Sequence, residues 1–312
     1  MSVTAPMPRV SAVVVSFNTR ADTLRCLRSL RAQLPLPAEI MVVDNASQDG
    51  SAEAIRADFP DVALLALAAN VGFGAANNRA LARVQTPYAL LLNSDAELCP
   101  GAIEALAQHL DRHPEVGAAG PRTLNSDGTL QVSWGPRLTP VNEWRHRRWR
   151  RAVAAGKGWA CARLAELGQR AHEPDWLSGS CLLLRMQSLR QSGFFDEGYF
   201  LYEEDADLCL RLRRARWTLA FVPTAEIVHH LGRSAAAAPE PSRLEYHRSH
   251  LRYYRLHNGR VRSVLLRAWL LGQAALGWLL AHGQSGDAGA TRRAWLGVAR
   301  LARWPALDRR TD

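Results

Sequence analysis

Four short apolar runs near the start of the chain alternate with segments in which apolar residues recur at helical spacing. Each run is bounded by polar turn residues, a pattern typical of strands buried on both faces of a parallel sheet. The predicted strands are Val10 to Ser16, Glu39 to Asp44, Val62 to Leu67 and Tyr88 to Asn93. The predicted helices are Asp22 to Gln33, Ala52 to Ala57, Gly74 to Val84 and Gly101 to His113. This order predicts a doubly wound α/β layer structure.

Two of these helices have capping signals at their starts. Thr19 and Asp22 have the spacing of a capping box, and Ser51 stands where a side-chain cap for the second helix is expected. The later segment from Pro136 to Glu173 is only weakly patterned, and we interpret it as an insertion.

Polar or glycine-rich residues follow each of the four predicted strands, at the sheet edge where ligands of such folds bind. The segments are residues 16–18, 44–47, 70–74 and 93–95. Two interpretations stay open for each segment alone, a plain turn or part of a binding site, because Asn, Ser, Asp and Gly all form turns. Four such segments at one edge favour a binding site.

Seven motifs carry a resemblance to a known family: VSFN, VVDNAS, NVGFGAANN, LLNSDAEL, WLSGSCLLLR, FFDEGYFLYEEDADLCLR and VHHLGRS. From Val10 to Ser234 the chain resembles the family 2 inverting glycosyltransferases of the GT-A fold, in particular the bacterial rhamnosyltransferase-like members. The resemblance implies an α/β, GT-A type doubly wound mixed sheet with a Rossmann-like nucleotide-binding half and an acceptor half. It implies a catalytic domain over residues 1–234. The residues themselves, in which arginine, tryptophan and leucine recur, predict a helical, basic and amphipathic extension over residues 235–312.

The resemblance also implies a divalent cation, Mg²⁺ or Mn²⁺, that screens the charge of the departing diphosphate. Asn93-Ser94-Asp95 stands where these enzymes have their DxD motif, and Asp95 supplies a hard oxygen ligand. His229, five residues before Ser234, is implied as the second metal ligand or, when protonated, as a direct contact of the diphosphate. Without the sheet-edge context, a turn after a strand explains Asn-Ser-Asp equally well.

The implied donor is a nucleotide sugar, with dTDP-rhamnose favoured and UDP- or GDP-sugars as alternatives. Asp44 is expected to bind the base or the ribose, because a carboxylate accepts the imide N–H of a pyrimidine. The other donor-binding residues implied are Ser16, Asn18, Asn45, Gly72, Asn77, Asn93 and Asp95. The implied acceptor is a polysaccharide or a lipid-linked saccharide.

The stretch YEEDADLCLR carries four carboxylates within five positions. Its leucines predict a helix that begins near Glu204, and the first turn of a helix favours negative charge, so helix electrostatics alone explain part of the cluster. By resemblance Glu204-Asp205 is the catalytic pair, with Asp205 the general base that takes the proton of the acceptor hydroxyl. Asp207 is expected to have a supporting role and to pair with Arg211 at i+4.

Three residues are predicted on the acceptor side of the site. Trp176 offers a flat apolar face to a sugar ring, and Gly179 leaves room for close approach. Core packing is an open alternative for Trp176. We expect Glu203 to be solvated or to face the acceptor.

Composition restricts the compartment and the partners. The five cysteines form no CxxC pair, so we expect buried thiols in a reducing cytosol, and the N-terminus lacks the apolar region of a secretory signal. The formal net charge of +10 favours an anionic partner. A nucleic-acid-binding protein would fit that charge but leaves the aspartates unexplained, so no nucleic acid partner is expected. A sugar-phosphate nucleotidyltransferase needs a Gly-rich, Arg-containing loop after its first strand, where this chain has VSFNTRADT.

Arginine and tryptophan alternate in WRHRRWRR (residues 144–151) and recur in the C-terminal extension. On amphipathic helices they favour the surface of an anionic membrane, and we expect a cytoplasmic protein, peripheral on the inner face of the plasma membrane. The apolar stretch from Val264 to Ala281 contains Arg267 and Gln273, which disfavours a spanning helix. Leucines packed on the catalytic domain beneath a solvated basic face are the remaining alternative.

Overall fold

The structure of the protein, a computed structural model, describes residues 9–33, 39–230, 239–280 and 288–303. Contacts divide the chain into two compact units. The first consists of Met1–Asp196 with Asp205–Ser234, and the second of Glu197–Glu204 with Ala235–Asp312. The first unit contains the sheet, and the described part of the second unit is helical apart from the segment that precedes α8.

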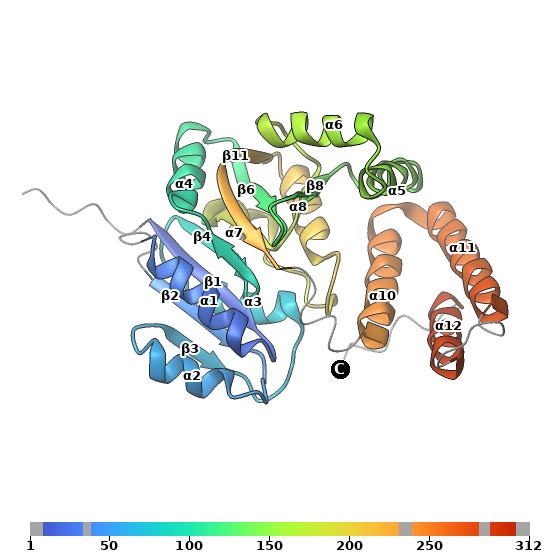
Figure 1. Cartoon of the computed structure of the whole chain (residues 1–312), viewed down its shortest axis with the longest axis horizontal. Coiled ribbons are helices and arrows are strands. Elements are labelled where there is room, and N and C mark those ends of the chain that lie inside the picture. The colour runs from blue at the N-terminus through green and yellow to red at the C-terminus, as the bar shows by residue number, and fades with distance from the viewer. Residues whose placement is uncertain (1–8, 34–38, 231–238, 281–287, 304–312) are drawn as a thin grey trace, which may run out of the picture. The chain divides into compact units, whose positions relative to one another are not determined.

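The first unit is built on a mixed sheet, drawn in Figure 1, with the strand order β3-β2-β1-β4-β10-β6-β11-β5. Four strands of the N-terminal half are parallel neighbours: β1 (Val10–Ser16), β2 (Glu39–Asp44), β3 (Ala63–Ala66) and β4 (Tyr88–Asn93). β10 (Cys181–Arg185) runs antiparallel between β4 and β6 (Val116–Leu124). β11 (Thr218–His229) is parallel to β6 and antiparallel to β5 (Ala96–Leu98), and the short β7 (Leu130–Gln131) pairs with β6.

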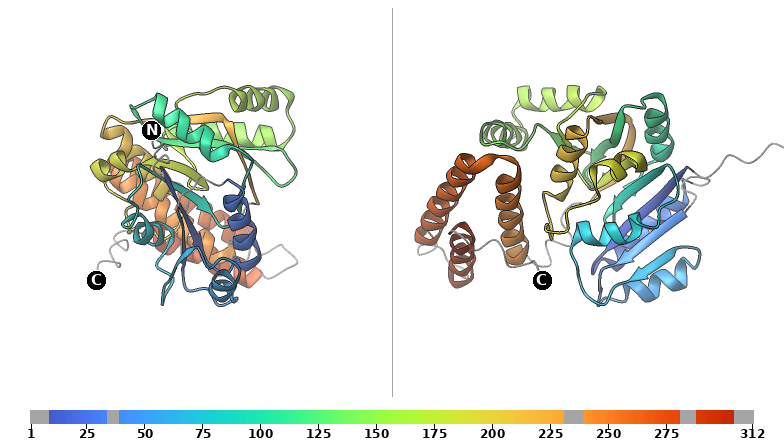
Figure 2. Two further views of the ribbon diagram at one scale, coloured as in Figure 1. Left: turned by 90° about the vertical axis from the view of Figure 1, so that its left-hand side faces the viewer. Right: turned by 180° about the vertical axis from the view of Figure 1, so that it is seen from behind.

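Helices cover both faces of this sheet (Figure 1, Figure 2). α1 (Arg20–Arg31), α2 (Ser51–Asp58) and α4 (Ala102–Arg112) pack on one face, against Val10, Ala12 and Val14. α3 (Phe73–Leu81), α7 (Met186–Ser192) and α8 (Glu204–Arg214) pack on the other face, with Val13 and Val15. Because alternate residues of a strand point to opposite faces, β1 is apolar at nearly every position. The predicted doubly wound mixed α/β fold is confirmed.

Three of the four predicted strands, β1, β2 and β4, have the predicted bounds. β3 is shorter than predicted, and its side chains are half-buried or exposed. The prediction that this run is buried on both faces is therefore wrong. β3 stands at the end of the sheet and pairs with β2 alone, which leaves its other side open.

Both predicted side-chain caps are wrong. α1 does begin after Thr19, but the Thr19 hydroxyl makes no capping hydrogen bond and lies 2.9 Å from the hydroxyl of Ser94. α2 begins at Ser51 itself, so Ser51 is inside the helix and Gly50, with φ of 77°, occupies the N-cap. A tertiary contact in the first case and a glycine turn in the second replace the local cap.

The weakly patterned insertion folds into two helices, α5 (Pro140–Ala154) and α6 (Gly158–Gln169). Thr139 caps α5 by accepting the N–H of Asn142 at 3.3 Å, and proline occupies the first helical position. The strands β8 (Trp134–Gly135) and β9 (Trp176–Leu177) pair with each other on either side of this insertion in the chain.

The described part of the second unit contains α10 (Pro239–His257), α11 (Gly259–Leu280) and α12 (Ala288–Ala302). α11 packs against both other helices. Arg267, which interrupts the apolar sequence of α11, is buried and donates to the Ala302 carbonyl at 3.1 Å, at the C-terminus of α12. By length and composition alone α11 is capable of spanning a membrane, and 28% of its apolar stretch is buried within the protein.

The cysteines are free, and three of the five are buried as predicted. Cys99 and Cys161 are half-buried, which corrects the expectation for those two. Burial raises the pKa of Cys209 to about 12 and also raises that of Cys181, so neither thiol is ionised near neutral pH.

Candidate functional site

The register of the strands brings the predicted site segments to one edge of the sheet. Ser16 lies opposite Asp44, and Val15 lies opposite Asn93. β10 begins at this same edge because it runs antiparallel to β4, and the Asn93 N–H donates to the Ser180 carbonyl at 2.9 Å. Segments that are far apart in sequence therefore meet where sheets of this class bind ligands.

Asp95 and His229 contact each other at the paired ends of β5 and β11. Asp95 Oδ1 lies 3.2 Å from His229 Nε2, and both side chains are buried. The other ring nitrogen, Nδ1, lies 3.0 Å from Gln131 Oε1, a contact that orients the imidazole. Burial alone would raise the pKa of Asp95, but its hydrogen bond to His229 and the charge of that residue outweigh burial. The pKa of Asp95 consequently lies below its ordinary value of 3.8, and the group is a carboxylate at neutral pH.

The side chains around Asp95 include the kinds of nitrogen and oxygen atom that bind small divalent cations. Asn93 Oδ1 is buried and has no hydrogen-bond partner among the described residues. Neighbouring ligands of an octahedral Mg²⁺ or Mn²⁺ lie about 3 Å apart, which is close to the Asp95–His229 separation. Within the described ranges no group of three His, Cys, Asp or Glu side chains converges on a metal position. A cation here would be held by Asp95 and His229, with phosphate oxygens or water completing its shell, because it is the Asn93 amide nitrogen that lies near His229 Nε2, at 3.4 Å.

Hydrogen bonds hold the segment that links β4 to β5. The hydroxyls of Ser94 and Thr19 lie 2.9 Å apart, and the Asp95 carbonyl accepts the N–H of His230 at 2.9 Å. The ring of His230 contacts Glu97 at 2.8 Å, so His229 is the histidine whose ring lies beside Asp95. Ser234, the other member of the expected motif, lies outside the described residues.

One carboxylate oxygen of Asp44 accepts a hydrogen bond, and the other has no partner among the described residues. Its side chain is 3% exposed, and Oδ2 accepts the Ser47 N–H at 3.1 Å. Oδ1 is buried without a hydrogen-bond partner in the described part of the chain. Buried carboxylate oxygens are normally satisfied, so this atom is available to an N–H or O–H group of a ligand.

The loop before α3 is held by Asn45. This side chain donates to Asn70 Oδ1 at 2.8 Å, and its own Oδ1 accepts the Val71 N–H at 3.0 Å. Gly72 follows with φ of 91°, a conformation that residues with a side chain rarely adopt. Asn45 therefore positions the loop, and Gly72 allows its turn.

Three other predicted donor residues differ in how accessible they are. Ser16 is fully buried, and its hydroxyl lies 2.9 Å from that of Thr23. Asn77 is almost fully buried and donates to the Phe73 carbonyl at 3.0 Å. Asn18 has an exposed side chain, and its Oδ1 accepts a backbone N–H of the loop after β2 at 2.8 Å. Of these three, only Asn18 is exposed.

Asp205 lies in the first turn of α8, as predicted, with its side chain half-buried. Its Oδ2 accepts the Gly179 N–H at 2.9 Å, and its Oδ1 accepts the Ala206 N–H at 2.7 Å. Gly179 directly precedes Ser180, whose carbonyl accepts the Asn93 N–H. Two hydrogen bonds, one from a backbone N–H to the Asp205 side chain and one between backbones, therefore connect Asp205 to the segment that carries Asp95.

The other carboxylates of the acidic cluster are buried. Asp207 accepts a hydrogen bond from Arg211 Nε at 2.8 Å, so the predicted i+4 pair is confirmed. Glu203 is 9% exposed and lies 2.8 Å from His250 Nδ1, so the first of its two alternatives, a solvated side chain, is wrong, and a position facing the acceptor stays a prediction. Both residues of that pair belong to the second unit, in which α10 covers this carboxylate. Glu204 is the buried first residue of α8.

Trp176 is half-buried and packs against the hydrophobic core. The indole lies so close to Gly135 that a Cβ there would be 2.7 Å from Trp176 Nε1. Its ring also meets His146 edge to face, with 6.4 Å between the centroids. These contacts are those of a side chain packed on the core, which is the alternative for Trp176 that the sequence left open.

The chain is related to known proteins over most of its length. The sequence profile described as glycosyl transferase family 2 matches residues 11–166, half of the chain. The chain belongs to this family. Relatives of this glycosyltransferase include the N-acetylglucosaminyl-diphospho-decaprenol L-rhamnosyltransferase of Mycobacterium tuberculosis, which is 33% identical over 253 residues, 76% of this chain and 81% of that protein. Rhamnosyltransferase WbbL of Escherichia coli is 45% identical over 56 residues, which cover 18% of this chain and 21% of WbbL.

Solved structures of other glycosyltransferases share the fold. Mannosyltransferase PcManGT from Pyrobaculum calidifontis, in complex with GDP-Man and Mn²⁺, superimposes with a TM-score of 0.57 at 18% identity, covering 97% of this chain and 90% of that one. GalNAc-T7 with UDP, GalNAc and Mn²⁺ gives a TM-score of 0.56 at 14% identity over 95% of this chain and 55% of that one. At such identities the likeness concerns the fold, and the predicted GT-A fold is confirmed.

Sequence reasoning missed the partners that orient the site of this glycosyltransferase. Gln131, which contacts the His229 ring, lies in the two-residue strand β7 and belongs to no motif. Thr19 was interpreted as a helix cap, although its hydroxyl contacts Ser94. A polar residue at the edge shared by the four strand ends is the signal that would have selected Thr19, whereas no local signal selects Gln131.

We expect Gly179→Ala to fold normally and to lose activity. A Cβ at Gly179 would lie 3.5 Å from Asp205 Cβ and 3.5 Å from Phe73 Cε1, which are ordinary contacts, yet the methyl group would occupy space beside the Asp205 carboxylate. Thermal unfolding should match that of the unmodified protein, while sugar transfer falls about a hundredfold, as for other small displacements at reacting centres.

Gly117→Ala is the matched control for that substitution. There a Cβ would lie 2.8 Å from Trp217 Cβ in the core, so overpacking should destabilise the fold by about 1–3 kcal/mol. Full activity of Gly179→Ala would show that no reacting group approaches this glycine.

Proposed function

We propose that this enzyme is an inverting glycosyltransferase that moves rhamnose from dTDP-rhamnose to a hydroxyl group of a lipid-linked saccharide, using a divalent cation and Asp205 as general base. The observation that carries the proposal is the connection of Asp205 to the Asp95–His229 pair through Gly179, Ser180 and Asn93 at one edge of the sheet. Such an edge can present a base to an incoming alcohol beside the group that stabilises the departing diphosphate.

The N–H groups of Gly179 and Ala206 orient the Asp205 carboxylate. In the proposed reaction the acceptor oxygen attacks the anomeric carbon while the bond from that carbon to the β-phosphate oxygen breaks. The acceptor proton passes to Asp205, and the electron pair of the broken bond remains on the diphosphate. Attack opposite to the leaving group inverts the configuration. A bound cation supplies electrostatic stabilisation of the diphosphate, for which Asp95 and His229 are the proposed ligands.

The donor assignment rests on Asp44 and on the relatives. The partner-less Oδ1 of Asp44 suits the imide N–H of thymine or uracil, which supports a dTDP- or UDP-sugar. The Mycobacterium tuberculosis relative is named as a rhamnosyltransferase acting on a diphospho-decaprenol-linked sugar, which supports rhamnose as the sugar and a lipid-linked acceptor. The two solved glycosyltransferase structures that contain Mn²⁺ support a metal.

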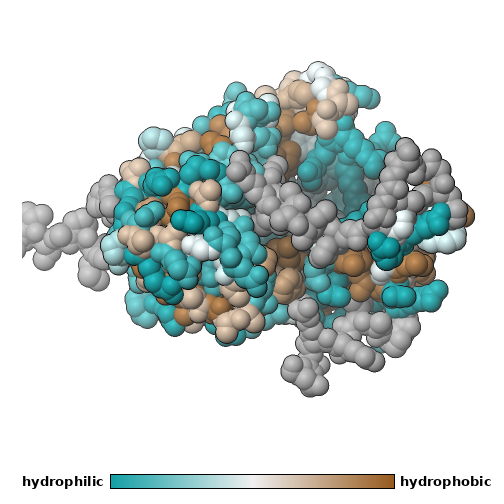
Figure 3. Space-filling model, turned by 60° about the horizontal axis from the view of Figure 1, so that its bottom comes forward, coloured by the Kyte–Doolittle hydropathy of each residue, from teal (hydrophilic) through white to brown (hydrophobic). Residues whose placement is uncertain are grey.

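The second unit supports placement at a membrane surface. The helices α11 and α12 contain six arginines and no carboxylate. Figure 3 shows hydrophobic residues beside hydrophilic ones at the surface of the C-terminal helices, on its right-hand side. The large hydrophobic residues exposed on α11 are Val261, Val264, Leu265, Trp269, Leu271, Leu276, Trp278, Leu279 and Leu280. An apolar surface beside cations suits the headgroup region of an anionic leaflet.

Asp205→Asn should abolish most transfer while donor binding persists. An amide cannot take the acceptor proton, so kcat should fall about 10²–10⁴-fold, with an unchanged Kd for the nucleoside diphosphate measured by calorimetry. Asp58→Asn, at an exposed position on α2, is the control and should retain full activity. Weaker donor binding with unchanged kcat would refute the base assignment.

Asp95→Ala should weaken metal-dependent donor binding. Losing the carboxylate removes a charged ligand, so affinity for dTDP in the presence of Mn²⁺ should fall by more than about tenfold. With EDTA present, the variant and the unmodified protein should bind dTDP alike. Equal affinity in Mn²⁺ would count against the proposed cation site.

Leu276→Glu combined with Leu279→Glu should release the protein from anionic vesicles. Both side chains are exposed on α11, at 58% and 60%, and a carboxylate there would be repelled by phosphatidylglycerol. Flotation with phosphatidylglycerol vesicles measures the effect, and Ala57→Glu on exposed α2 is the control. If the double variant still binds the vesicles and carbonate does not extract it, α11 spans the membrane instead.

A further inference from the structure

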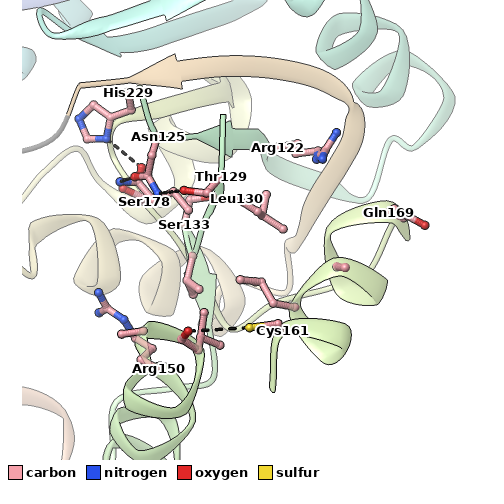
Figure 4. A pocket seen from close by; sticks show the side chains of 16 residues that line it. Arg122, Asn125, Thr129, Leu130, Ser133, Arg150, Cys161, Gln169, Ser178 and His229 are labelled. Carbon is pink, nitrogen blue, oxygen red and sulfur yellow. Dashed lines mark hydrogen bonds between the residues drawn. The ribbon is translucent and has the colours of Figure 1, made fainter. Parts of the chain in front are cut away.

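A cavity of about 680 Å³ adjoins the reacting centre of the first unit (Figure 4). This volume is in the range of about 300–1,000 Å³ that is usual for small-molecule sites. His229 and Ser178 line it. His229 contacts Asp95, and Ser178 directly precedes Gly179, the residue that donates to Asp205. The cavity therefore adjoins both the proposed diphosphate side and the proposed base side of the site.

Much of the remaining wall comes from β7 and from the insertion helices α5 and α6, and the side formed by the two helices is mostly apolar. The apolar side chains are those of Leu130, Val132, Val153, Ala154, Leu164 and Ala165. The side chains beside His229 are polar, among them Asn125, Thr129 and Ser133, and can bind the hydroxyl groups of a saccharide, whereas the helix side would leave such groups without partners. A hydrocarbon chain, in contrast, gains free energy when this surface removes it from water.

Arg150 of α5 lies at the opposite end of the cavity from His229 in Figure 4. Its side chain is exposed, and it makes no hydrogen bond or ion pair with any other residue that the structure describes. Arg122, the other arginine of the lining, contacts Glu226 at 2.8 Å and so has a carboxylate partner already. The guanidinium of Arg150 is therefore available to an anion, and phosphate matches its donor geometry.

We propose that this cavity binds the amphiphilic acceptor of the reaction. Arg150 contacts an acceptor phosphate, and the apolar side chains of α5 and α6 cover the first part of its hydrocarbon chain. The inference rests on the proposed function and adds to it the part of the chain that recognises a lipid diphosphate. The polar end at His229 and Ser178 is where the acceptor hydroxyl then meets the donor.

Farnesyl diphosphate is a soluble probe that carries both a diphosphate and a prenyl chain. Its Kd is measured by calorimetry on the full chain, with Mn²⁺ and dTDP in excess so that the donor site is filled. Arg150→Gln should weaken binding about tenfold, as expected for a lost hydrogen bond between charged groups. Arg148→Gln is the matched control, because Arg148 lies on the same helix, 4.8 Å over the Trp144 ring and outside the cavity lining, and binding should not change.

Ala165→Trp tests the apolar wall separately. The indole would fill the space beside α6, so farnesyl diphosphate should bind about tenfold more weakly while the melting temperature stays the same. Failure of the unmodified protein to bind the probe, or equal effects of Arg150→Gln and Arg148→Gln, would overturn the assignment. Transfer assays separate the two proposals. If the enzyme transfers sugar but Arg150→Gln does not change binding of farnesyl diphosphate, only the cavity assignment is refuted. If binding of the probe depends on Arg150 but no acceptor receives a sugar, only the proposed function is refuted.

Discussion

The site depends on the backbone pairing that aligns β1, β2, β4 and β10 at one edge of the sheet. The hydrogen bond from Asn93 to Ser180 is the link between its halves, since β4 leads into the Asp95 segment and β10 follows the glycine that holds Asp205. A slip of one residue in this pairing would turn every side chain of a strand to the other face. The apolar residues on both faces of these strands oppose such a slip. Core packing therefore fixes the distance between Asp95 and Asp205, although neither side chain is part of the hydrophobic core.

The sequence predicts the parallel half of the fold well, because its strands are long enough for continuous apolar runs to stand out. No strand was predicted for β6 or β10. The strands β5, β7, β8 and β9 were also missed, and these are only two or three residues long and have no detectable period. The capping residues at the helix starts were predicted less well. Capping signals are local in sequence, whereas the side chains at these starts contact residues far away in the chain. The Thr19 hydroxyl, for example, contacts Ser94, 75 residues away.

For the site, the sequence predicts which residues gather at the edge better than what each one touches. Asp95, His229 and Asp205 stand in motifs and do lie at this edge of the sheet. Their neighbours come from elsewhere, as Gln131 does for the His229 ring, 98 residues away. For Glu203 the sequence left two alternatives, solvated or facing the acceptor, and the packing of α10 on this side chain excludes the first. Tertiary contacts of this kind have no signature in the local sequence.

The segment Glu197–Glu204 belongs by its contacts to the C-terminal unit, although it leads directly into α8. Tyr202 and Glu203 have φ of 72° and 66°, and such conformations cost a residue with a side chain about 1–2 kcal/mol each. Contacts from α10 offset this cost: Glu203 with His250 at 2.8 Å, Ser249 Oγ with the Leu201 carbonyl at 2.7 Å, and the rings of Tyr202 and Tyr246 at 5.9 Å. Asp205 follows two residues after Glu203. A domain that ended at residue 234 would therefore lack the contacts that hold the chain entering α8, the helix that carries the proposed base.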